Sequence, residues 1–136
     1  MSAHNEKFPW LSYYKNYNFF EERMRSHSNV TDIRQIDLGF YEIKLTNENI
    51  LRVFICECYS YDVAEYDETV QNLGEVNAII INSNWCGYTL DAKFHCLQRK
   101  VGIFNIGGFM KAINRERYWE FLTDYERGRF IENGWY

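Results

Sequence analysis

Proline is almost absent from this chain. Pro9 is the one proline among 136 residues, and internal repeats, low-complexity tracts and linker-like stretches are missing as well. Nothing in the sequence therefore interrupts the chain after its N-terminal arm, and its length is sufficient to enclose one hydrophobic core. We predict a single domain over residues 1–136, with an N-terminal helix over 10–27, a core over 33–113 and a helical C-terminal extension over 114–136.

Long apolar runs are also absent. No stretch approaches the roughly 18 consecutive apolar residues of a membrane-spanning helix, and no secretory signal pattern is present. The four cysteines, Cys56, Cys58, Cys86 and Cys96, show neither a CxxC pair nor the Cys/His spacing of a zinc site. We therefore expect a cytoplasmic protein with reduced, mostly buried thiols and no membrane partner.

Basic charge is in deficit. The chain has 15 Lys and Arg against 19 Asp and Glu, which gives a net charge of −4. This balance counts against broad attraction to a phosphate backbone, which requires clustered Lys and Arg. Local fields can differ in sign from the net charge, so a small DNA-binding site stays open as an alternative.

Aromatic residues, by contrast, are abundant. They make up 18% of the chain, with 11 Tyr, 10 Phe and 4 Trp, and a core of this size cannot enclose all of them. We expect an exposed or partner-covered aromatic patch. Trp and Tyr are favoured at binding hot spots, so Trp119, Trp135 and Tyr136 are the predicted contacts to a protein partner or to a second copy of the chain.

Hydrophobic spacing gives the order of the elements. Apolar residues recur at helical spacing over 10–27, and a β-hairpin is expected from strands at 33–46 and 50–59 with a turn at 47–49. A short amphipathic helix follows within 61–76, then the buried strand NAIIINSN at 77–84. A helix at 90–100, a strand at 101–107 and a closing helix or pair of helices from 108 complete the pattern. Helical crossovers between short buried strands predict a mixed α/β sheet with a helix layer on each face.

Three local patterns together resemble a known superfamily. They are the apolar strand RVFICECY ending near an acid, the strand–turn–helix NAIIINSNWCGYTLDAKFHC, and the last strand and closing helix VGIFNIGGFMKAI. Residues 50–113 resemble the core of the restriction-endonuclease-like, or PD-(D/E)xK, nucleases, most closely the Mrr-like branch. The resemblance implies a three-layer fold with a central mixed sheet. A different α/β protein with a similar topology is the alternative.

The resemblance also implies a set of site residues. Nucleases of this superfamily hold Mg²⁺ or Mn²⁺ between two carboxylates, with a lysine two residues after the second acid. Glu57 matches that second acid, but Tyr59 stands at the lysine position. Glu42 on the preceding strand is the expected first acid, with Asp37 as a weaker candidate. Lys93 is the candidate for a relocated catalytic lysine.

The missing lysine determines the functional expectation. We expect a degenerate, non-catalytic restriction-endonuclease-like protein that acts as a binding or regulatory subunit and needs no cofactor. The alternative is an active nuclease that depends on Mg²⁺ or Mn²⁺, with Glu42 and Glu57 as metal ligands and Lys93 as the cation.

Overall fold

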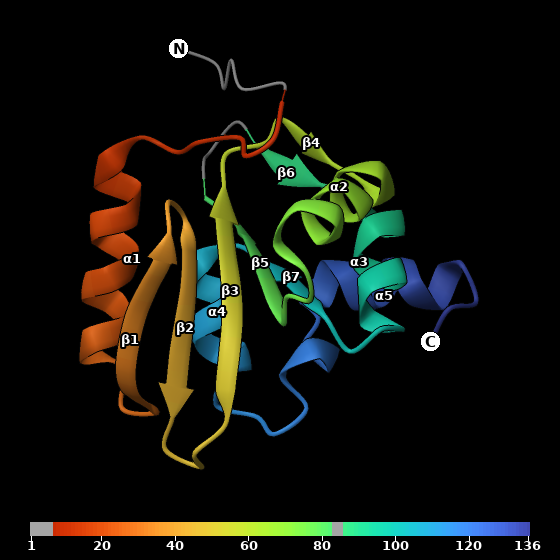
Figure 1. Cartoon of the computed structure of the whole chain (residues 1–136). Coiled ribbons are helices and arrows are strands. Elements are labelled where there is room, and N and C mark those ends of the chain that lie inside the picture. Colours follow the sequence, from red (N-terminus) through yellow and green to blue (C-terminus); the bar gives the residue numbers. More distant parts are fainter. Residues whose placement is uncertain (1–6, 83–85) are drawn as a thin grey trace.

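The computed structural model describes residues 7–82 and 86–136, and it consists of a mixed β-sheet between two layers of helices (Figure 1). The strands of the main sheet lie in the order β1-β2-β3-β5-β7. Their bounds are β1 Val30–Asp37, β2 Phe40–Leu45, β3 Ile50–Cys56, β5 Ala78–Ile81 and β7 Gly102–Phe104. The first three strands are antiparallel neighbours, and β5 and β7 continue the sheet parallel to β3. The predicted α/β class and parallel crossovers are therefore confirmed.

The helices divide between the two faces of the sheet. One hydrophobic cluster joins the sheet to α1 (Tyr14–Ser26) and α4 (Ile106–Ala112), and a second joins the opposite face to α2 (Val63–Leu73) and α3 (Leu90–Leu97). Successive residues of β5 alternate between these clusters, because side chains on a strand point alternately to opposite faces. All four residues of β5 are consequently buried. Among the described residues, no helix is long and apolar enough to cross a membrane.

The N-terminal helix is shorter than predicted. It begins at Tyr14, whereas the apolar spacing predicted a start at residue 10. Trp10 is buried in the cluster on the α2/α3 face, against Phe54 and Tyr61, while α1 covers the other face. The segment before Tyr14 must pass around the end of the sheet to reach that position, so it cannot continue the helix.

The strand predicted at 33–46 is two strands. β1 and β2 are joined by a tight turn at Leu38 and Gly39, and Gly39 has a φ of +74°. A Cβ atom at Gly39 would lie 2.7 Å from the carbonyl oxygen of Ile55, so only glycine fits this turn. The hairpin between β2 and β3, with its turn after Leu45, is confirmed.

The C-terminal extension consists of separate short elements. A 3-10 turn, η1 (Tyr118–Glu120), and the helix α5 (Asp124–Glu132) follow α4. Thr123 ends any continuous helix because its hydroxyl caps α5, in a capping box with Glu126. A small parallel pair, β4 (Ser60–Tyr61) with β6 (Gly87–Tyr88), lies outside the main sheet.

Candidate functional site

Glu57 lies just beyond the end of β3, against the N-terminus of α1. Its Oε2 accepts hydrogen bonds from the backbone N–H of Tyr13 and from the side-chain amide of Asn16, both at 3.2 Å. Tyr13 is the N-cap residue of α1. The N-terminus of a helix carries unpaired N–H groups and a partial positive charge, which a carboxylate satisfies. Glu57 therefore caps a helix that is far from it in the sequence.

Two further contacts fix this arrangement. The backbone N–H of Glu57 donates to the carbonyl of Trp10 at 2.8 Å, which attaches the N-terminal arm to the end of β3. The amide of Asn16 also donates to the carbonyl of Asn82, just after β5. Asn16 thus joins α1 to the ends of two neighbouring strands. The strand-end acid has backbone and amide partners, which explains how an apolar strand tolerates it.

The structure does not bring Glu42 and Glu57 together. Glu42 is the register partner of Arg52, which lies five residues before Glu57 on the chain. At about 3.3 Å per residue, this offset separates the two positions by about 16 Å along the strand, too far for one shared metal ion. The carboxylate of Glu42 accepts a hydrogen bond from Arg34 on β1 instead.

Asp37, the weaker candidate, lies nearer to Glu57 than Glu42 does. It is the last residue of β1, two residues before Gly39, whose carbonyl accepts from the N–H of Ile55. Asp37 and Glu57 are therefore at the same end of the sheet. The side chain of Asp37 accepts from the N–H of Leu38 in the turn. Across the described parts of the chain, no group of three or more His, Cys, Asp or Glu residues is arranged to hold a metal ion.

The two residues considered for the catalytic cation lie in different surroundings. Tyr59, at the position of the motif lysine, is 67% exposed. Lys93 is 1% exposed, and its Nζ donates to the carbonyl of Ile103 on β7 and lies 3.9 Å from the carboxylate of Glu126 on α5. Its Nζ also lies over the ring of Tyr88 on β6. Within the described ranges, the side-chain contacts of Lys93 are thus with β6, β7 and α5, and none is with Glu57.

Burial controls the charge state of this lysine. It lowers the pKa of Lys93 to about 8, while Glu126 acts in the opposite direction. The ammonium also lies 4.2 Å from the centre of the Phe104 ring, and the hydroxyl of Tyr88 donates to Glu126. Glu126, which the sequence pattern did not single out, is therefore the partner that makes a buried lysine tolerable.

The cysteines behave as buried apolar residues. Cys56, Cys58 and Cys96 are buried, and all three belong to the cluster on the α2/α3 face. Burial raises the pKa of Cys58 to about 11 and that of Cys96 to about 12. Thiols in this state are poor nucleophiles at neutral pH.

The three predicted partner-binding aromatics differ in their contacts. Trp135 stacks on Phe94 with ring centres 4.6 Å apart, and it also contacts the ring of Phe130, so it anchors the chain end to α3 and α5. Tyr136 is 75% exposed. Trp119 is partly buried, packs against the core on the α1/α4 face and lines a surface cleft.

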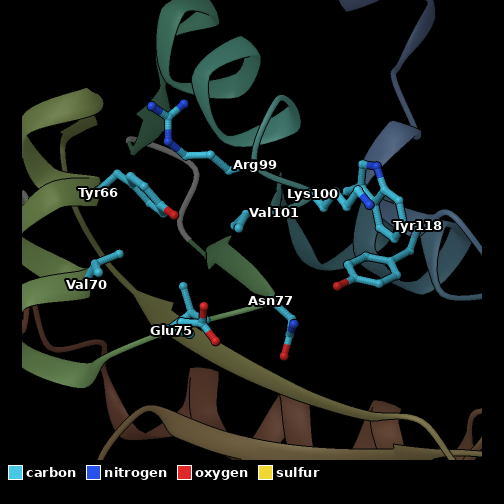
Figure 2. A pocket seen from close by; sticks show the side chains of 10 residues that line it. Tyr66, Val70, Glu75, Asn77, Arg99, Lys100, Val101 and Tyr118 are labelled. Atoms are coloured by element: carbon cyan, nitrogen blue, oxygen red, sulfur yellow. The ribbon is translucent and has the colours of Figure 1, made fainter.

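Figure 2 shows this cleft, which lies at the N-terminal ends of β5 and β7. Its volume is about 610 Å³. Tyr66 from α2 stands on one side, with Lys100 on the other and Asn77 and Glu75 below them. Trp119 also lines the cleft. Arg99 and Tyr118 complete the polar and aromatic lining.

Positive charge gathers around Trp119. The Nζ atom of Lys100 lies 6.0 Å from its ring centre, and the guanidinium carbon of Arg117 lies 5.7 Å from it. Arg99 lies in the same cleft, where Glu75 is the one acidic residue among the lining residues that the structure describes. Apart from Trp119, the sequence interpretation missed the cleft residues. The pair Arg99–Lys100, at the end of the helix predicted at 90–100 in an acidic chain, was the available signal.

Comparison with known proteins gives no further identification. No protein-family model, no curated protein and no solved structure matches this chain.

Proposed function

We propose that this protein is a non-catalytic member of the restriction-endonuclease-like superfamily and acts as a binding or regulatory subunit. The order of elements supports the assignment: an antiparallel meander precedes two helical crossovers to parallel strands, with helices on both faces. The superfamily match itself rests on the three sequence patterns at residues 50–113. The protein then needs neither Mg²⁺ nor Mn²⁺, and its buried thiols suit a cytoplasmic location.

The proposal rests on one observation: both candidate catalytic residues, Glu57 and Lys93, are bound to structural partners. Glu57 is held by the N-terminus of α1, and Lys93 is held by Ile103 and Glu126. Each residue therefore fastens one helix to the sheet, and their partners differ. An active nuclease would require a metal-binding acid pair and a nearby cation, and the register places Glu42 far from Glu57.

The cleft around Trp119 is the binding surface in this proposal. It combines Trp, Tyr and Arg, the residue types that dominate binding hot spots, and its lining carries more basic than acidic side chains. A partner segment with acidic and aromatic side chains complements this lining. A chain with a net charge of −4 can bind an acidic segment here, because the electrostatic field in the cleft depends on the basic side chains close to it.

Glu57→Ala separates the structural role from a catalytic one. We expect wild-type protein to leave DNA and RNA intact with Mn²⁺ or Mg²⁺. The variant should lower the free energy of unfolding by about 1 to 2 kcal/mol, because α1 loses its capping carboxylate. Urea denaturation measures the second effect, and the exposed Glu116→Ala is the matched control. Metal-dependent cleavage by the wild type that disappears in Glu57→Ala would overturn the proposal.

Calorimetric titration tests the cleft. We expect a short peptide of alternating Glu and Tyr to bind the wild type and a Lys–Tyr peptide not to bind. Trp119→Ala should weaken the first interaction about tenfold, as loss of a hot-spot residue does. Lys111→Ala, which removes a basic residue on α4 outside the cleft, should leave it unchanged. Equal binding of both peptides, or equal binding by Trp119→Ala, would exclude the cleft as the binding surface.

A further inference from the structure

The strand β1 is the outermost strand of the sheet beside β2 (Figure 1). Across residues 7–82 and 86–136, β2 is the one strand that pairs with it. Most of its eight side chains are exposed, and Val30 and Ile33 are partly buried. The helix α1 packs against β1 on the α1/α4 face. The outward-facing backbone groups of an edge strand are a template for pairing with another strand.

The pairing within the sheet shows which backbone groups of β1 face outward. The N–H of Leu45 donates to Asn49, which follows β2 and precedes β3, so Leu45 and alternate residues of β2 point towards β3. Lys44 and Glu42 then point towards β1, where their register partners are Asp32 and Arg34. It follows by alternation that the N–H and C=O groups of Ile33 and Gln35 point away from the sheet.

Charge then distinguishes between the registers open to a second copy. When two β1 strands pair antiparallel, residues whose N–H and C=O groups face outward must lie opposite each other. The register of the second strand can therefore shift only by two residues at a time. Pairing of Ile33 with Ile33 of the second copy sets Asp32 opposite Arg34 on both sides of the two-fold axis. A two-residue shift of the register in one direction sets Asp32 opposite Asp32, and the same shift in the other direction sets Arg34 opposite Arg34. Opposite charges stabilise cross-strand pairs and like charges destabilise them.

We propose that the protein forms a two-fold symmetric homodimer in which β1 strands from two copies pair antiparallel about Ile33. The segment Thr31–Gln35 makes the contact, and the two sheets join into one. Arg34 already binds Glu42 within its own chain, so the interface places Arg34 between two carboxylates. This inference concerns a different surface from the cleft and does not depend on it.

Other features of the sheet keep this association to two copies. The pairing of β1 with β2 is irregular between Val30 and Asp32 and again between Gln35 and Asp37, so the regular segment is short. Irregularities of this kind limit how far an edge can pair. At the opposite edge, Lys93 donates to the carbonyl of Ile103 on β7. A two-fold contact at β1 is therefore self-closing.

Charge reversal with complementation tests the register. We expect wild-type protein to sediment as a concentration-dependent dimer that weakens at high salt. Asp32→Arg and Arg34→Asp should each weaken self-association about tenfold or more, because each variant places two like-charged pairs in the interface. An equimolar mixture of these two variants should sediment as a heterodimer, since every cross-strand pair is again of opposite charge. Asp124→Arg and Arg127→Asp, which reverse an exposed ion pair on α5, are the controls and should keep wild-type association.

A second variant keeps the test decisive if a reversal disturbs folding, which circular dichroism would show. Gln35→Pro removes an outward N–H while leaving the bonds to β2 in place, and proline is tolerated at such edge positions. This variant should be monomeric. A monomeric wild type at every concentration would overturn the proposal. Undiminished dimers in the single reversals, or failure of the two folded reversals to associate when mixed, would also overturn it.

Discussion

Lys93 is a lysine that lies almost entirely out of contact with water, and its surroundings determine when it carries a proton. Burial lowers its pKa to about 8, compared with 10.5 for a lysine in water. Between these values the folded protein binds fewer protons than the unfolded chain, so stability must rise with pH across this window. Below pH 8 the lysine is protonated in both states, and the full cost of burying the charge is present.

Lys93→Met measures this cost. The free energy of unfolding of the wild type minus that of the variant should rise by about 2 to 3 kcal/mol between pH 8 and 10.5, because a one-proton difference changes stability by at most about 1.4 kcal/mol over one pH unit. The difference between the proteins is the correct quantity, because buried tyrosines and cysteines with raised pKa values oppose the trend in both. Urea denaturation over a pH series gives the curve. A flat difference would mean that Lys93 is accessible to water.

At the scale of the elements, the turn after α3 places a residue with a strained backbone beside the cleft. The helix ends at Leu97, and Lys100 adopts a φ of +62°, in the left-handed region that glycine occupies without penalty. Its backbone N–H donates to the carbonyl of Leu97, and its Nζ atom lies 6.0 Å from the centre of the Trp119 ring. Any residue with a Cβ atom lowers the stability of the fold at this backbone conformation. Lys100 has this cost, and its side chain supplies a cation to the cleft.

Lys100→Gly should therefore stabilise the protein by about 0.5 to 1 kcal/mol while weakening binding at the cleft. Lys100→Ala is the matched control, because it removes the cation but keeps the strained backbone. We expect the alanine variant to weaken binding equally without a gain in stability. Thermal or urea denaturation provides the measurement. Equal stability of the two variants would show that the backbone at residue 100 is not strained.

For the whole molecule, one sheet connects two hydrophobic clusters. Ala78 and Ile80 belong to the cluster under α1 and α4, whereas Ile79 and Ile81 belong to the one under α2 and α3. Loss of packing in either cluster exposes apolar side chains on one face of β5. The two faces should therefore unfold together, as in a single cooperative unit.

The indole N–H signals of the tryptophans test this expectation. Trp10 lies in the cluster on the α2/α3 face, and Trp119 packs against the cluster on the α1/α4 face. In nitrogen-15 spectra recorded over a urea series, both native signals should disappear with the same midpoint. Midpoints that differ beyond measurement error would show that the chain unfolds in more than one unit.

One local feature of the site was predictable from residue type alone. Glu57 at the end of an apolar strand indicated an acid that needs a partner, because a carboxylate is costly in apolar surroundings unless it is paired. The partner of Glu57 could not be predicted, because Tyr13 and Asn16 lie more than 40 residues away. The same holds for Lys93, because its carboxylate partner Glu126 lies on α5, a distant segment of the chain.

The sequence by itself determined the α/β class, the crossovers between β3, β5 and β7, and the burial of the apolar strands, because periodicity and β-branching act over a few neighbouring residues. Tertiary structure alone decided the strand register, the split of residues 33–46 at Gly39, and the partners of Glu57 and Lys93. These depend on which distant segments meet once the two faces of the sheet are covered. The register separates Glu42 from Glu57, and the packing of α1 and α5 gives both motif residues structural partners.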